Sequence, residues 1–152
     1  MIFFPTRKKW NGDCPHDNPD VCLPPREAWT GGPQNRWSQM RKMKKGDFFS
    51  LHIGKPRVIS RVEARTEDVR YPLRYKVDIQ EDYNSPWVVV GEYGGPIDVP
   101  LNPPRKLVAI RFMITEPRVK GPHGRPVSWC IYDLLLTGKG IFGKFKRVIP
   151  EE

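Results

Sequence analysis

The chain has 152 residues, which favours a single domain, because domains typically contain about 100–200 residues. Lys and Arg number 26 against 17 Asp and Glu, a net charge of +9, and Pro and Gly number 17 and 13. So much proline excludes a helical bundle or a coiled coil, since each interior proline removes a helix hydrogen bond and costs about 3 kcal/mol. No apolar run reaches the roughly 18 residues of a membrane span. The hydrophobic fraction of 38% still supports a core, so the composition indicates a loop-rich, all-β domain with a basic surface.

Residues 1–21 form a predicted N-terminal arm, because they are rich in Pro, Asp and Asn and show no hydrophobic period. The opening residues, Met1–Pro5, are too short for the core of a signal peptide, and basic residues follow them rather than precede them. We therefore expect the chain to stay in the cell or to leave it by lysis or co-assembly, with an extracellular or virion surface favoured. Trp10, within this arm, is expected to dock on a neighbouring molecule.

Three cysteines, Cys14, Cys22 and Cys130, allow at most one intramolecular disulfide. Cys14, His16 and Cys22 could supply part of a zinc site. Their spacing fits no usual zinc knuckle, however, and no second pair of ligands follows. We expect ordinary thiols or a Cys14–Cys22 disulfide.

Strand signals become regular from residue 48 onward. Residues 48–53 place Phe49, Leu51 and Ile53 on one face, and a predicted turn at 54–57 follows. The predicted strands are 48–53, 58–64, 73–79, 87–90, 107–115 and 129–136. Short strands at this spacing, with turn residues between them, predict an antiparallel β-sandwich over residues 22–138, followed by a C-terminal arm at 139–152.

Seven segments of this region follow one another in the order of a known family. They are AWTGGPQNRWS (28–38), DFFSLHIGKP (47–56), VISRV (58–62), YKV (75–77), WVVV (87–90), VAIRF (108–112) and SWCIYDL (128–134). The chain therefore resembles the discoidin, or coagulation-factor type C, domains and their galactose-binding-like carbohydrate-binding relatives. The resemblance implies an eight-stranded antiparallel jelly-roll β-sandwich.

The same resemblance implies a position for calcium, because many relatives hold a structural calcium ion beside the first loop. It matches Asn35 to a family threonine and Asp133 to a family glutamate, whereas Gly31 or Gly32 replaces the family aspartate. Calcium takes six to eight oxygens, several of them anionic, so this set would bind it only weakly. We expect no cofactor, with calcium at Asn35 and Asp133 as the alternative.

The predicted loops alternate between the two ends of an up-and-down sandwich. One end holds loops 38–47, 65–71, 93–96 and 116–127, and the other holds 54–57, 80–86 and 101–106. The first set carries nine Lys and Arg against four Asp and Glu, and the second carries four against two. The basic excess therefore lies at the end where the relatives carry their ligand loops.

The predicted binding residues combine aromatic rings, on which sugars stack, with cationic donors that suit anionic groups. They are Arg65, Arg70, Tyr71, Tyr93, Arg118, Lys120, His123 and Arg125. The alternative is that the loop charges are simply solvated. Four tryptophans, Trp29, Trp37, Trp87 and Trp129, are expected in the core or in loop packing rather than as sugar platforms.

Catalysis is not expected, because His16, His52 and His123 lie in separate segments and no phosphate-binding loop or pair of metal ligands is present. We expect a non-catalytic module that binds a glycan or an anionic cell-surface polymer. The alternative is a structural decoration, adhesion or connector subunit of a virion or extracellular assembly, whose partners are copies of itself or other subunits. Nucleic-acid binding is disfavoured, since no motif or basic helix accompanies the charge.

Overall fold

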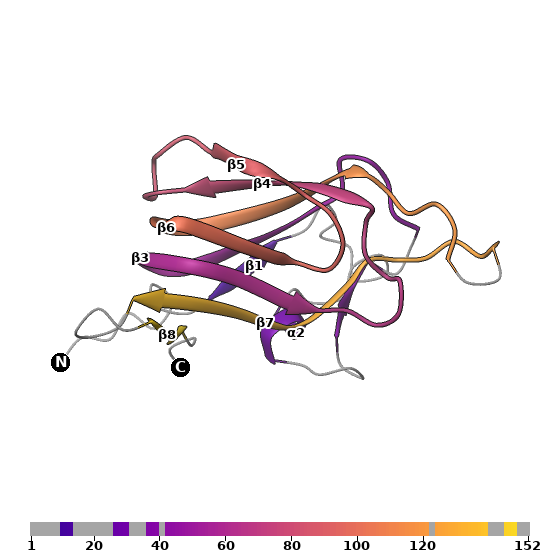
Figure 1. The fold of residues 1–152 in the computed structure, drawn as a ribbon, viewed down its shortest axis with the longest axis horizontal. Coiled ribbons are helices and arrows are strands. Elements are labelled where there is room, and N and C mark those ends of the chain that lie inside the picture. The colour runs from indigo at the N-terminus through magenta and orange to yellow at the C-terminus, as the bar shows by residue number, and fades with distance from the viewer. Residues whose placement is uncertain are drawn as a thin grey trace.

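The computed structural model is an antiparallel β-sandwich (Figure 1). It describes residues 10–13, 26–30, 36–39, 42–121, 124–139 and 145–148. In chain order the elements are β1 (Asn11–Asp13), α2 (Glu27–Thr30), β2 (Trp37–Ser38), β3 (Phe48–Arg65), β4 (Arg74–Gln80), β5 (Val88–Tyr93), β6 (Asp98–Glu116), β7 (Cys130–Lys139) and β8 (Phe145–Val148). This confirms the all-β, antiparallel fold class. The domain boundaries at residues 22 and 138 stay a prediction.

The two longest strands, β3 and β6, pair with each other along most of their length, from Phe48 opposite Met113 to Glu63 opposite Asp98. The register shifts between His52 and Arg57, next to Gly54, whose φ is 88°. Only glycine adopts such a backbone freely, so the pair can bend there. Each strand therefore contributes to both layers of the sandwich.

One layer contains the first half of β3 and the second half of β6. β4 continues this layer beyond β6, β5 forms its edge beside β4, and β1 pairs with residues 50–52 of β3. The other layer contains the second half of β3 and the first half of β6, and β7 pairs with β3 there. β8 and β2 pair with β7. Figure 1 shows β4 and β5 at the top of the view and β7 and β8 below.

The core lies between the layers and is formed by the alternating apolar positions that the sequence indicates. Phe49, Leu51 and Ile53 are buried on β3, as predicted. Trp37 packs edge-on against Phe49 and Trp129, with ring centroids 4.8 and 5.6 Å away. Trp37 and Trp129 are therefore core residues, which confirms that part of the prediction, and burial of such large rings is among the strongest contributions to stability.

Two predicted loops are wrong. Residues 54–57 belong to the continuous strand β3, and residues 101–106 belong to β6. The second error arose from Pro100, Pro103 and Pro104, which normally exclude a strand. The first half of β6 pairs with β3 alone, and an edge strand tolerates prolines because its outer N–H groups need no partner.

Both predicted arms contain a short edge strand, since β1 pairs with β3 and β8 pairs with β7. The expectation that Trp10 docks on a neighbouring molecule is wrong. Trp10 is buried within its own chain, where it meets Trp29 edge-on at 5.8 Å between ring centroids. The described residues contain no helix long and apolar enough to cross a membrane.

One charged side chain on the outer face of the first layer is buried rather than solvated. The Asp78 side chain is 2% exposed, and its Oδ2 accepts hydrogen bonds from Arg111 Nε at 3.1 Å and Nη2 at 2.7 Å. The Arg111 guanidinium in turn lies 4.5 Å from the ring centroid of Trp87. Trp87 and the bonded pair shield this part of the sheet, which explains why an arginine stands inside the apolar run of β6.

Tyr75 gives a testable pH dependence. Burial raises the pKa of Tyr75 to about 12, because the phenolate would lose its hydration. Its unfolded-state pKa is about 10, so folding favours the protonated form. This contribution is complete below pH 10 and is lost as the pH rises toward 12. We expect the free energy of unfolding to fall by about 2–3 kcal/mol over that range on account of Tyr75.

Denaturant unfolding of the wild type and Tyr75→Phe at about pH 9 and about pH 12 measures this effect. The variant is expected to show the shallower pH dependence, because it has no phenol at this position. Equal slopes in the two proteins would contradict the assignment.

Candidate functional site

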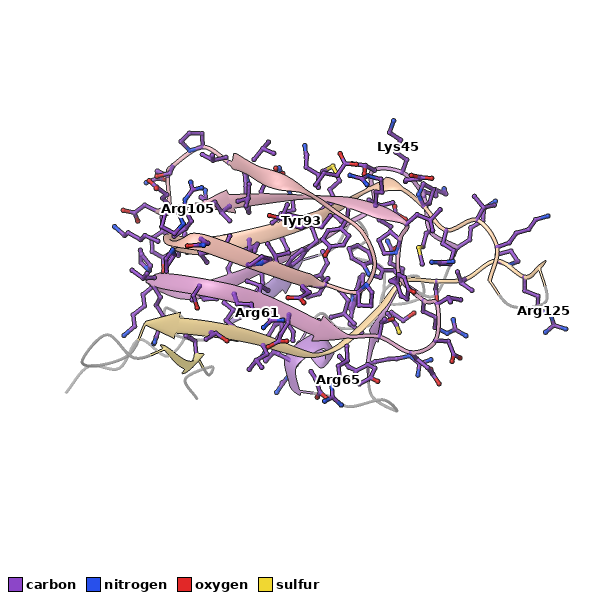
Figure 2. All side chains as sticks on the ribbon, viewed as in Figure 1. Lys45, Arg61, Arg65, Tyr93, Arg105 and Arg125 are labelled. Atoms are coloured by element: carbon purple, nitrogen blue, oxygen red, sulfur yellow. The ribbon has the colours of Figure 1, made fainter. Side chains whose placement is uncertain are left out.

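Four connections gather at one end of the sandwich, and we call this the loop end: the described parts of residues 39–47, 66–73, 94–97 and 117–129 (Figure 1). Figure 2 shows Lys45 and Arg125 at this end and Arg105 at the opposite end. Because successive antiparallel strands run in opposite directions, every second connection lies at the same end of the sandwich. These loops therefore meet although they are far apart in the sequence.

The 66–73 loop is fixed to β7 by its backbone. Thr66 Oγ1 donates to the carbonyl of Arg70 at 2.9 Å, and the N–H of Cys130 donates to the same carbonyl at 3.1 Å. Arg36 adds an ion pair to Glu67, with Nη1 and Oε2 2.5 Å apart. This loop therefore has a defined conformation, which is what a preorganised binding surface requires.

The 117–129 loop contains a tight turn that carries two of its basic residues. The N–H of Gly121 donates to the carbonyl of Arg125 at 2.7 Å, and the N–H of Gly124 donates to the carbonyl of Gly121 at 3.1 Å. The φ of Gly124 is 70°, a conformation that favours glycine. Lys120 and Arg125 are exposed on either side of this turn.

Arg118 is held against Tyr71. The guanidinium carbon lies 4.9 Å from the ring centroid of Tyr71, and Nε donates to the Tyr71 carbonyl at 3.3 Å. Such stacking of a cation on an aromatic face is favourable by about 0.5–2 kcal/mol. Among the described residues, the two Nη nitrogens of Arg118 make no hydrogen bond. They form the edge of the guanidinium that binds a carboxylate or sulfate in two parallel bonds.

Arg70 lies next to Tyr71 in the chain and is held by a second contact. Its Nη1 donates to Ser128 Oγ at 3.2 Å, and that hydroxyl is 3.1 Å from Ser38 Oγ. The 66–73 loop, the 117–129 loop and the end of β2 thus meet at Ser128. Sequence analysis missed Ser128, Ser38 and Arg36, and no local signal could have found them, because each acts on a residue far away in the chain.

The charges at the loop end are only partly balanced. Within the described ranges, Lys45, Lys120 and Arg125 form no ion pair, and Asp47 accepts from the backbone N–H of Lys44 at 2.9 Å. Glu67 is paired with Arg36. Three exposed cations therefore stand without a carboxylate partner at the end that the loop alternation predicts to be basic.

The predicted binding residues occupy three different places. Arg70, Tyr71 and Arg118 come together through the contacts described above, and Lys120 and Arg125 lie in the neighbouring loop. Tyr93 faces inward on β5 and stacks on Tyr75, with ring centroids 6.1 Å apart. Arg65 ends β3 and approaches Asp133 of β7, with Nε and Oδ2 3.9 Å apart. His123 lies outside the described residues.

Of the two predicted calcium ligands, the structure describes only Asp133. Asp133 is exposed and faces Arg65, whereas Asn35 lies outside the described residues, as do Cys14, His16 and Cys22. Across the described ranges, no group of three His, Cys, Asp or Glu side chains could hold a metal ion. Calcium at Asn35 and Asp133 stays a prediction.

Gly121 is a point at which the loop end is sterically constrained. A Cβ on this residue would overlap the side chain of Val127, which is buried against the core. We expect Gly121→Ala to lower the free energy of unfolding by about 1–3 kcal/mol, because the turn must open or Val127 must move. Denaturant unfolding measures the loss. Lys120→Ala is the control and should change stability by less than about 0.5 kcal/mol. Equal stability of the two variants would contradict this account of the turn.

The sequence matches no protein-family model, and it has no significant match among curated proteins. Comparison of structures, by contrast, finds many similar chains.

A family 32 carbohydrate-binding module of Clostridium perfringens NanJ, solved with galactose, is 15% identical. It has a TM-score of 0.62, with 86% of this chain and 94% of that chain covered. Chitosan-binding module 1 of a chitosanase/glucanase from Paenibacillus sp. IK-5 is 16% identical and has a TM-score of 0.67. The match covers 90% of this chain and 100% of that chain. The family 32 module of AlyQ, solved with 4,5-unsaturated mannuronic acid, is 13% identical and has a TM-score of 0.56. The match covers 82% of this chain and 92% of that chain. The chain therefore has the galactose-binding-like β-sandwich fold of these carbohydrate-binding modules.

Proposed function

We propose that this protein is a non-catalytic module that binds an anionic glycan through its loop end. The fold supports a glycan as the partner, because the similar structures are carbohydrate-binding modules solved as domains of nearly the same length. The ligands named for them are galactose, chitosan and an unsaturated mannuronic acid, of which the last carries a carboxylate.

The contact that carries the proposal is that of Arg118 with Tyr71. Because Nε is bonded to the Tyr71 carbonyl and the ring supports one face, the orientation of the guanidinium is fixed before a ligand arrives. The Nη edge is then available to a carboxylate or sulfate of the glycan. An arginine that is already oriented loses less conformational entropy on binding than a freely moving one.

Arg70, Lys120 and Arg125 support the same ligand class in a different way. Arg125 and Lys120 are exposed, and opposite charge on the ligand would draw it toward the loop end. Arg70, bonded to Ser128, can offer its remaining donors to sugar hydroxyls. The rim therefore supplies attraction, and the stacked Arg118 supplies the directed contact.

The test compares two arginines at opposite ends of the sandwich. We expect Arg118→Ala to weaken binding of oligomannuronate or heparin about tenfold or more, since a hydrogen bond to a charged group contributes about 1.5–3 kcal/mol. Arg105→Ala removes the same charge far from the loop end and is expected to change the affinity less than about twofold. Isothermal titration calorimetry on the intact chain measures both, with galactose as a neutral comparison ligand.

Equal losses in the two variants would contradict the loop-end site, because a general charge effect would then explain them. The absence of binding to both acidic glycans and to galactose would contradict glycan binding itself. Raising the salt concentration is expected to lower the affinity for the acidic glycans more than the affinity for the neutral one.

A non-catalytic module returns its ligand unchanged. After prolonged incubation with the protein, we expect chromatography to recover oligomannuronate at its original length. Shortened or unsaturated products that also appear with Arg118→Ala at an equal rate would point to a contaminating enzyme. Products that depend on Arg118 would contradict the proposal.

A further inference from the structure

An open cavity of about 380 Å³ lies over the paired strands β3 and β7, away from the contact of Arg118 with Tyr71. It is lined by Glu63, Ala64 and Arg65 of β3 and by Asp133 and Leu135 of β7. Its volume is within the range of about 300–1,000 Å³ that is typical of small-molecule sites. Figure 2 shows Arg65 toward the end of β3, beyond Arg61 on the same strand.

A β-bulge in β7 shapes this cavity. Glu63 pairs with Leu135 and Arg65 pairs with Tyr132, so Asp133 and Leu134 both lie opposite Ala64. Asp133 has a φ of 50°, which non-glycine residues adopt uncommonly and aspartate adopts more readily than most. As a result Leu134 is buried in the core, whereas the Asp133 side chain remains half-exposed at the cavity. Bulges commonly redirect a side chain in this way beside binding sites.

The three charged side chains of the cavity are open to solvent, so a ligand would bind them by replacing water. Arg65 Nε and Asp133 Oδ2 are 3.9 Å apart, which is too far for a hydrogen bond, and Glu63 approaches Arg61 at 3.8 Å. Arg61 itself is bonded to Asp98, at 2.9 Å for both contacts. Among the described residues, the charged atoms of Glu63, Arg65 and Asp133 thus donate or accept no hydrogen bond.

We infer that this cavity is a second binding site, which takes a neutral, hydroxyl-rich sugar residue. Two carboxylates accept from hydroxyl groups, and the guanidinium donates to them, so adjacent hydroxyls of a pyranose ring can satisfy all three. Leu135 provides an apolar surface for the C–H groups of the ring. Two negative charges against one positive charge disfavour an acidic sugar, in contrast to the loop end.

The test maps binding residue by residue on the intact chain. Galactose, glucose, mannose and N-acetylglucosamine are titrated separately at millimolar concentrations while the backbone amide signals are followed by NMR. At least one of the four is expected to shift the amides of residues 63–65 and 133–135. Arg118→Ala is expected to leave this response unchanged, because Arg118 does not line the cavity.

Asp133→Gly is the diagnostic variant, because glycine accepts the φ of this position and removes the carboxylate. We expect it to lower the affinity for the sugar about tenfold, because it removes a hydrogen bond to a charged group. Lys106→Ala, at an exposed position outside the cavity, is the matched control and should bind as the wild type does. Thermal unfolding checks that both variants are folded.

The inference is overturned if none of the four sugars shifts the cavity amides of the folded wild type, or if Asp133→Gly binds as tightly as the wild type. Shifts confined to residues 66–73 and 117–129 also overturn it, while leaving the loop-end proposal intact. Conversely, loss of acidic-glycan binding in Arg118→Ala bears on the loop end alone. The two sites can therefore fail separately.

Discussion

The pairing of β3 with β6 is the constraint on which the rest of the fold depends. These strands contribute to both layers, so β4 and β5 continue from one half of the pair and β7 from the other. The bend near Gly54 lets the same hydrogen-bonded pair pass from one layer to the next. Phe49, Leu51 and Phe112 are then buried on facing strands, and each such side chain contributes about 1.5–3 kcal/mol through its burial. Loss of this pairing would separate both layers and disperse the loop end.

Sequence periodicity predicts the fold well where one face of a strand is buried and the other is solvated. Residues 73–79 alternate clearly and form most of β4, whereas the apolar run 129–136 forms most of β7. Residues 54–57 look like a turn because they combine Gly54 with Pro56, yet the β3–β6 pairing continues around them. That outcome depends on contacts with residues about fifty positions away, so no local pattern could indicate it. The prolines in β6 are tolerated for a similar reason, since β4 pairs only with the second half of β6 and leaves the first half as an edge.

The candidate site is predictable in charge but not in contacts. Counting loop charges predicts a basic end, because alternation of loops follows from strand order alone. Tyr71 and Tyr93 then look equivalent in the sequence, although one lies in a loop beneath Arg118 and the other faces Tyr75 in the core. The difference comes from side-chain direction along β5 and from the fold of the 66–73 loop. Asp78 and Asp98 also look alike in the sequence. Arg111 and Trp87 bury Asp78, whereas Asp98 is exposed and paired with Arg61.

Under the proposed function, the basic residues at the loop end contribute unequally to binding, because their environments differ. Lys120 and Arg125 are exposed, so an ion pair there is weakened by water and salt and contributes about 0–1 kcal/mol. The guanidinium of Arg118 is half-buried against Tyr71 and has already lost part of its hydration, so pairing with an anion costs it less. Affinity should therefore depend on the single oriented arginine, whereas the exposed charges mainly raise the association rate. Under the proposed function, the net charge of +9 draws an anionic ligand toward the molecule, and the contact of Arg118 with Tyr71 selects which ligand stays bound.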